Sequence, residues 1–181
     1  MPSLVVPILD AGPFRLRPFA LADLGAVREA AADPLIPLIT TVPASFTEEE
    51  GRRFIERQWR RAEQGTGYSF AIADAATDQA LGQVGLWLKD ADEGRASVGY
   101  WIIGSARGRR AAATAVQAVV RWAHHDLRIP RLQLYVEPWN TASVKTAENA
   151  GFQREGLLRS WQEVGGQRKD MYMYAHLTQG P

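Results

Sequence analysis

The chain has 181 residues, of which 46% are hydrophobic and 23% charged, as is typical of globular proteins. Its net charge of +1 excludes a broad basic face of the kind that binds nucleic acid. The chain has no cysteine, which excludes disulfides, thiolate catalysis and sulfur-ligated metals, and its three histidines show no metal-ligand spacing.

The apolar segments are all too short to span a membrane, and the N-terminal segment lacks the features of a signal peptide. There is also no internal repeat and no composition change that would mark a domain boundary. We therefore expect one cytoplasmic domain over residues 1–181, with no membrane, nucleic-acid or metal partner.

The first third of the chain shows alternating and helical hydrophobic patterns. They predict a strand at 14–19, a helix at 21–34, a proline-containing loop at 35–46 and a helix from 48 to 65. Thr47 and Glu50 form a capping-box pattern at the start of this second helix, with each side chain placed to bond the other residue's amide.

The middle of the chain combines three strands with a crossover. Residues 68–74, 80–89 and 95–103 alternate as strands joined by short polar turns, which favours antiparallel pairing. An amphipathic helix then ends before Pro130, and 131–136 is another strand. A strand, helix and strand of this length form a crossover, so the strands 95–103 and 131–136 should be parallel. His124 and His125 fall on the polar side of the helix and are expected at the surface.

The last segment begins with a capped helix and ends with a hairpin. Asn140 is a suitable N-cap for a helix at 141–150, and Gly151 is suited to the left-handed residue after it. Two alternating runs, 157–164 and 167–177, flank the glycine pair at 165 and 166, which is a strong hairpin signal. The predicted fold is α/β: a mixed, mostly antiparallel sheet with helices on both faces and one parallel crossover. The hairpin edge is a plausible contact for a homodimer.

The loop between the strand 95–103 and the following helix contains Arg107, Gly108, Arg109 and Arg110. In an open α/β sheet, ligands bind beyond the carboxyl ends of parallel strands, where unpaired helix amides attract anions. Three arginines and a glycine at this point suit a pyrophosphate. A solvated turn is the simpler reading of an isolated Arg-Gly-Arg-Arg string, and a minor-groove DNA hook is disfavoured because such hooks lie in flexible basic tails.

This loop and the segment after it resemble the GNAT superfamily of N-acetyltransferases, in its RimJ/RimL-like branch. The family's loop pattern, Arg/Gln-x-x-Gly-x-Gly/Ala, matches Arg107 to Ala112. Its second signature, an asparagine, a serine or alanine three residues later and a helix into Gly-Phe, matches Asn140, Ser143, Gly151 and Phe152. The order of the predicted elements agrees over nearly the whole chain.

The resemblance implies direct acetyl transfer from acetyl-coenzyme A to a primary amine in a ternary complex. The acceptor amine would belong to a protein N-terminus or a small molecule. The coenzyme site that the resemblance implies has three parts: loop residues Arg107, Gly108, Arg109, Arg110, Ala111 and Ala112 at the pyrophosphate, backbone near Ile102 along the pantetheine, and Asn140 with Ser143 near the sulfur.

Two positions depart from the family pattern. Arg110 replaces a glycine, and we expect it to be already helical, since the sequence that follows is strongly helix-forming. A positive φ there would instead cost on the order of 1 kcal/mol. Ala147 stands where many relatives place a tyrosine taken to be the general acid, which leaves Ser143, Tyr135 or water as proton donor.

Glu137, just past the strand 131–136, is the best-placed candidate for a general base, and Asp92 and Glu93 are candidates acting through water. Each of these acids is also readily explained as a solvated surface residue.

Four aromatic residues are candidates for the acceptor pocket, although aromatics at strand spacing are more often core: Tyr100, Trp101, Trp139 and Trp161. The departures at Arg110 and Ala147 motivate an alternative in which the chain is a non-catalytic module that binds the coenzyme or a partner.

Overall fold

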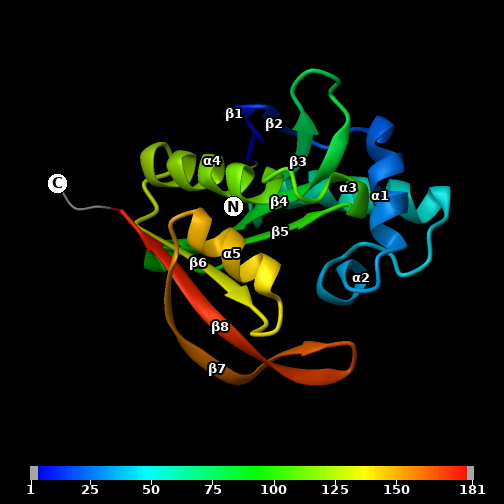
Figure 1. Ribbon diagram of the computed structural model, residues 1–181. Helices are drawn as coiled ribbons and strands as arrows, with labels where there is room; N and C mark the ends of the chain where they lie inside the picture. Colours follow the sequence, from blue (N-terminus) through cyan, green and yellow to red (C-terminus); the bar gives the residue numbers. More distant parts are fainter. Residues whose placement is uncertain (1–3, 179–181) are drawn as a thin grey trace.

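The computed structural model describes residues 4–178 and contains one eight-stranded sheet, shown in Figure 1. The strands are β1 (Leu9–Ala11), β2 (Phe14–Arg17), β3 (Gly67–Asp74), β4 (Ala80–Trp87), β5 (Arg95–Ile102), β6 (Arg131–Val136), β7 (Gln153–Val164) and β8 (Gln167–Leu177). The helices are α1 (Leu24–Ala31), α2 (Ile36–Ile39), α3 (Glu48–Glu63), α4 (Ala111–His125) and α5 (Thr141–Asn149). Three single 3₁₀ turns lie at Leu21–Asp23, Ala91–Glu93 and Gly104–Ala106.

The strand order is β1-β2-β3-β4-β5-β6-β8-β7, and β5 with β6 is the parallel pair in an otherwise antiparallel sheet. The α4 crossover connects this pair, as a parallel connection requires. The predicted fold class is therefore confirmed.

Helices cover both faces of the sheet, which can be read from β3. The rings of Tyr68 and Phe70 contact the ring of Trp122 of α4 edge-on, with centroids 4.7 and 5.6 Å apart. Ser69, which points the opposite way because side chains alternate along a strand, donates a hydrogen bond to Gln58 of α3 at 3.1 Å. Thus α4 and α3 pack on opposite faces and enclose two apolar layers (Figure 1).

The parallel strands pair over only part of their length. Their register runs from Arg95 with Arg131 to Ser97 with Gln133 and then stops, although β5 continues to Ile102 and β6 to Val136. The edge of β5 that faces β6 therefore has no strand partner over its last residues.

Several element predictions need correction. A short helix, α2, lies inside the predicted loop because the Asp33 carboxylate accepts hydrogen bonds from the amides of Leu35 and Ile36, and Pro37 is tolerated in a first turn. Strand β1 was not predicted, and β7 begins at Gln153 rather than at 157.

The capping box at the start of α3 forms only in part. The Glu50 amide donates to the Thr47 hydroxyl at 3.1 Å, as predicted. The Glu50 carboxylate, however, accepts from Arg53 at 2.7 Å instead of reaching back to the Thr47 amide. An ion pair on the helix surface has replaced the second capping bond.

Candidate functional site

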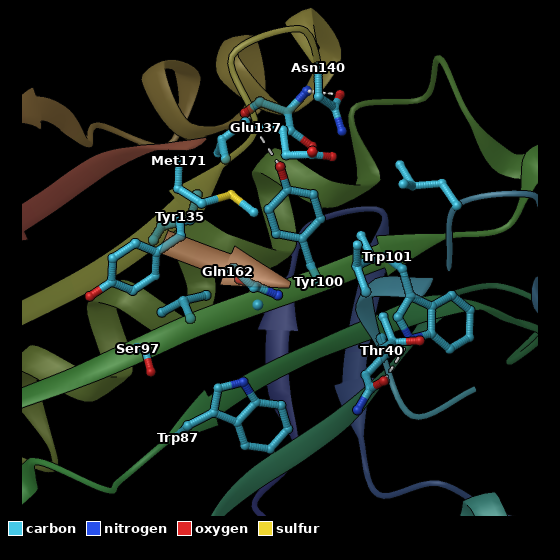
Figure 2. A pocket seen from close by; sticks show the side chains of 18 of the residues that line it. Thr40, Trp87, Ser97, Tyr100, Trp101, Tyr135, Glu137, Asn140, Gln162 and Met171 are labelled. Atoms are coloured by element: carbon cyan, nitrogen blue, oxygen red, sulfur yellow. Dashed lines mark hydrogen bonds between the residues drawn. The ribbon is translucent and has the colours of Figure 1, made fainter. Parts of the chain in front are cut away.

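Where β5 and β6 separate, they leave a cavity of about 590 Å³. It is lined by strand residues of β4, β5 and β6, by the turn before α5, and by α2 and the segment after it. Figure 2 shows the side chains of Tyr100, Glu137 and Asn140 gathered at one end of this cavity.

The turn between β6 and α5 places three candidate residues at that end. The Asn140 side chain caps α5 by accepting from the Ser143 amide at 3.1 Å, and the Asn140 amide donates to the Glu137 carbonyl at 2.9 Å. The cap explains why a helix starts at Thr141, and the backbone bond fixes Glu137 relative to it. Glu137, Asn140 and Ser143 all line the cavity.

Glu137 is 9% exposed, so its carboxylate is withdrawn from bulk water but open to the cavity. Asp92 and Glu93, the other candidate bases, lie in the 3₁₀ turn before β5 and do not belong to the cavity lining. Glu93 is paired with Arg95 at 2.6 Å. The geometry thus favours Glu137 among the three acids.

Tyr100 projects from β5 toward α5, and its hydroxyl donates to the Ser143 carbonyl at 3.4 Å. Burial raises the pKa of this hydroxyl, and hydrogen bonds with Ser143 and Thr146 offset part of the rise. Tyr100 therefore stays protonated at neutral pH and holds the first turn of α5 against β5. Ala147, by contrast, is fully buried and does not reach the cavity.

The arginine loop lies beyond the carboxyl end of β5 and leads into α4. Gly108 has φ +81° and Arg110 has φ +60°, with a residue of negative φ between them. Alternation of this kind turns successive amides toward one side and is typical of anion-binding nests. The amides of the first turn of α4, beginning at Ala111, also lack partners within the helix.

The conformation of Arg110 corrects the sequence-based expectation. Arg110 is the N-cap of α4 in the left-handed region, with φ 60° and ψ 16°, rather than a residue of the helix. The alanines after Arg110 favour a helix that begins at Ala111. The change of chain direction from the loop into the helix therefore falls on Arg110, which takes the left-handed conformation. The glycine of the family pattern at this position is therefore explained by backbone conformation.

The other two loop arginines are engaged by carboxylates. Arg107 pairs with Asp33 at 2.6 Å, and Arg109 pairs with Asp74 at 2.7 Å. Arg109, together with backbone amides, lowers the pKa of Asp74. These pairs fix the loop to the end of α1 and to the end of β3, so its amides are held in place before any ligand binds.

The predicted site thus has two parts in the structure. Glu137, Asn140 and Ser143 meet in the cavity, whereas the loop from Arg107 to Ala112 lies outside the cavity lining. Ile102, at the end of β5, lies along the chain between the cavity-lining Trp101 and the arginine loop.

Of the four aromatic candidates for the acceptor pocket, Tyr100 and Trp101 line the cavity. Trp139 is 62% exposed, and Trp161 stacks on Tyr135 at 5.8 Å from a half-exposed position. These two are outside the cavity lining.

A buried polar network under the cavity was not predicted. The indole of Trp101 donates to Gln83 at 2.6 Å, and Gln83 donates to Gln58 at 3.0 Å and to Ser69 at 2.6 Å. The one signal in the sequence was a glutamine within an otherwise apolar strand. Arg61 and Trp87, at the cavity's far end, carried no recognisable pattern.

Within residues 4–178, no three histidine or acidic side chains lie close enough together to hold a metal ion. The helices of the same residues are also too short or too polar to cross a bilayer.

A model of the acetyltransferase (GNAT) domain matches residues 14–153. The chain belongs to the GNAT family of acetyltransferases. It is 31% identical over 135 residues to the Bacillus subtilis protein named "Probable N-acetyltransferase YjcK", covering 74% of each chain. It is also 29% identical over 162 residues to "Uncharacterized N-acetyltransferase p20" of Bacillus licheniformis, covering 90% of this chain and 91% of that one.

Solved GNAT structures of lower identity share the fold. RimJ of Mycobacterium smegmatis, in complex with a coenzyme A disulfide, superposes with a TM-score of 0.80 at 23% identity over 96% of this chain and 87% of that one. The microcin self-immunity acetyltransferase MccE, in complex with acetyl-CoA and AMP, gives 0.80 at 20% identity over 98% and 97%. This GNAT protein is an acetyl-coenzyme-A-dependent N-acetyltransferase, and its likeness to RimJ is one of fold. The family assignment favours the enzyme over the non-catalytic module.

Proposed function

We propose that the protein transfers the acetyl group of acetyl-coenzyme A directly to a primary amine while both substrates are bound. The observation that carries this proposal is the juxtaposition of Glu137, Asn140 and Ser143 in a cavity bordered by the unpaired edge of β5. In this arrangement the Glu137 carboxylate can take the amine proton, the start of α5 can present a proton donor to the leaving thiolate, and the free edge of β5 can bind the pantetheine arm.

The coenzyme would occupy both parts of the site. The pyrophosphate would bind the amides from Gly108 to Ala112 at the positive end of α4, with Arg110 as a further donor. The pantetheine arm would add to the free edge of β5 near Ile102 as an extra strand does. The thioester would then lie where β5 and β6 separate, beside Asn140 and Ser143.

Glu137 would act on the acceptor amine. The amine nitrogen attacks the thioester carbonyl carbon, the carbon–nitrogen bond forms, and the nitrogen gives a proton to the Glu137 carboxylate. A protein α-amine has a pKa of about 8 against about 10.4 for lysine, so an α-amine is already partly neutral at neutral pH. Positioning then supplies much of the rate.

Ser143 would serve the leaving group. When the carbon–sulfur bond breaks, the thiolate takes a proton from the Ser143 hydroxyl, and the proton that Glu137 received from the amine returns through water to the Ser143 oxygen. Tyr100 would be a positioning residue, because its hydroxyl donates a hydrogen bond to the Ser143 carbonyl and so orients the turn that carries the Ser143 hydroxyl.

The test is thiol release from acetyl-coenzyme A in the presence of a panel of primary amines. With both substrates varied, direct transfer predicts intersecting double-reciprocal lines. Glu137→Gln should lower kcat by about 10²-fold or more with unchanged acetyl-coenzyme A affinity, the usual effect of losing a general base. Glu93→Gln, a change of the same kind outside the cavity, is the matched control.

Parallel double-reciprocal lines would contradict direct transfer, and equal effects of the two glutamate changes would contradict the role of Glu137. For the proton donor, Ser143→Ala should lower kcat more than Tyr100→Phe. The reverse order would assign the proton to Tyr100.

A further inference from the structure

The helix α3 carries five arginines, and two of them differ sharply from the rest. Three pair with glutamates of the same helix: Arg52 with Glu48, Arg53 with Glu49 and Glu50, and Arg60 with Glu56. Within residues 4–178, Arg57 and Arg61 have no such ion pair.

These two guanidinium groups face the segment that follows α2. Arg57 donates to the Thr41 carbonyl at 2.9 Å, and Arg61 reaches the Thr41 hydroxyl at 3.3 Å. The Nε of Arg57 is buried without a hydrogen-bond partner in the described structure. Burial lowers the pKa of Arg61, and the nearby charge of Arg57 lowers it further. Two like charges thus lie close together and partly withdrawn from water, and neither pairs with a carboxylate in the part of the chain that the structure describes.

Arg61 is held in a fixed position in the cavity wall. Its guanidinium lies over the Trp87 ring, 4.4 Å from the centroid, and donates to the Gln58 side-chain oxygen at 2.8 Å. Gln58 in turn belongs to the buried network that includes Ser69 and Gln83. A guanidinium on an aromatic face with one edge tied down presents its remaining donors in a defined direction.

The cavity therefore has a negative end and a positive end. Of its lining residues in the described chain, Glu137 is the one acid and Arg61 the one cation. Figure 2 shows Trp87, on which Arg61 stacks, at the end opposite Glu137. Trp87 pairs with Ser97 and Ser97 with Gln133, four residues before Glu137. Four residues at about 3.3 Å each span about 13 Å along β6, and two strand spacings of about 4.8 Å separate β4 from β6, so the backbones of the two ends lie roughly 16 Å apart. The Arg61 and Glu137 side chains both line the cavity and shorten the gap between their charged groups to on the order of 10 Å.

We propose that the acceptor is a primary amine that carries an anionic group, a carboxylate or a phosphate, on the order of 10 Å from its nitrogen, and that Arg61 binds this group while Glu137 receives the amine. This inference rests on the proposed function of the same cavity. A negative group placed there would offset the positive charge of the Arg57–Arg61 pair and orient the amine toward the thioester. The anion is thus the part of the substrate that distinguishes one amine from another.

The test uses peptides that differ in one group: Ala-Glu-Ala-amide, Ala-Gln-Ala-amide and the corresponding phosphoserine peptide. Binding to the coenzyme-A-saturated protein is measured by calorimetry, and acetyl transfer by thiol release. The anionic peptides should bind and react about tenfold better or more than the glutamine peptide, the effect of one charge-assisted hydrogen bond. The stronger of the two identifies carboxylate or phosphate as the preferred group.

Two variants test whether Arg61 is the source of the preference for anionic peptides. Arg61→Gln should reduce it to less than about twofold, since the lost interaction is the source of discrimination, with unchanged coenzyme affinity. Arg60→Gln, one residue away on the outer face of α3, should retain it. Equal binding of all three peptides by the native protein, or a preference that survives in Arg61→Gln, would overturn the inference. Failure to release thiol with any amine would instead refute the proposed function, and the binding comparison would still decide the role of Arg61.

Discussion

Arg110 holds a left-handed backbone conformation immediately before α4, and this conformation has an energetic cost. An L-residue there loses roughly 1–2 kcal/mol relative to its ordinary conformations, whereas glycine has no such penalty. The protein retains an arginine at φ +60°. Its side chain would add a donor for the coenzyme pyrophosphate at the positive end of the helix.

Replacing Arg110 by glycine should therefore stabilise the free protein. After glycine's larger loss of chain entropy is subtracted, the expected gain in unfolding free energy is about 0.5–1 kcal/mol, or roughly 1–4 °C in Tm for a protein of this size. Arg110→Ala removes the same charge but keeps the positive φ, and it should not raise the Tm. Equal Tm values for the two variants in thermal unfolding would show that the conformation is not strained.

At the scale of elements, the far end of α4 is joined to β8 by a histidine pair. His124 lies 2.9 Å from His176, Nε2 to Nδ1, and its own Nδ1 lies 2.7 Å from the Ile129 carbonyl. Since a carbonyl only accepts, His124 carries its proton on Nδ1, and its Nε2 accepts from His176. His124 is thus half-buried, contrary to the surface position expected for it, whereas His125 is exposed as predicted.

This pair makes stability depend on pH. Burial lowers the pKa of His176, the neighbouring His124 lowers it further, and a hydrogen bond with the Leu177 backbone offsets part of the decrease. In the unfolded chain a histidine has a pKa of about 6.5. Below that pH the unfolded state binds more protons than the native state, so the unfolding free energy should fall as pH decreases from 7 toward 5.

Urea denaturation between pH 5 and pH 7.5 measures this dependence. His176→Gln should flatten the decline, whereas His125→Gln, which changes an exposed histidine on the same helix, should leave it as in the native protein. An identical pH dependence in the native protein and His176→Gln would show that the pair contributes nothing to it.

The α5 helix shows which elements could be predicted from the sequence. Asn140 accepts from the Ser143 amide, Gly151 has φ +89°, and the Phe152 amide donates to the Ala147 carbonyl, as capping rules predict. These signals are local. The short helix α2 depends on a hydrogen bond from the Leu35 amide to the Asp33 carboxylate, on the other side of a proline. The strand β1 has only three residues. Hydrophobic periodicity could therefore not reveal either element.

Across the whole molecule, the antiparallel meander, the parallel pair and the C-terminal hairpin followed from the turn, crossover and glycine signals, and the structure confirms them. The order of the strands across the sheet was not predicted. The grouping of Glu137, Asn140 and Ser143 was also predictable, because the three are close in sequence. Arg61 and Trp87 were not, since they come from a helix and a strand brought together only by folding. The site residues that could be grouped from the sequence are those that lie close together in it.

We propose that the loop before α4 holds acetyl-coenzyme A. Calorimetric titration of the native protein, Gly108→Ala and Gly166→Ala tests it most directly. Both glycines have positive φ, +81° and +76°, and a Cβ at either would meet no atom within 4 Å, so the two changes impose similar local strain. Gly166 lies in the β7–β8 turn, whereas Gly108 turns the loop amides toward the proposed pyrophosphate site.

We expect the native protein to bind acetyl-coenzyme A with a Kd on the order of micromolar, a binding free energy of about −8 kcal/mol. Gly108→Ala should weaken it about tenfold or more, the loss expected for amides that no longer reach the phosphate oxygens, and Gly166→Ala should not weaken it. No binding by the native protein, or equal affinities in all three, would contradict the placement of the coenzyme at this loop.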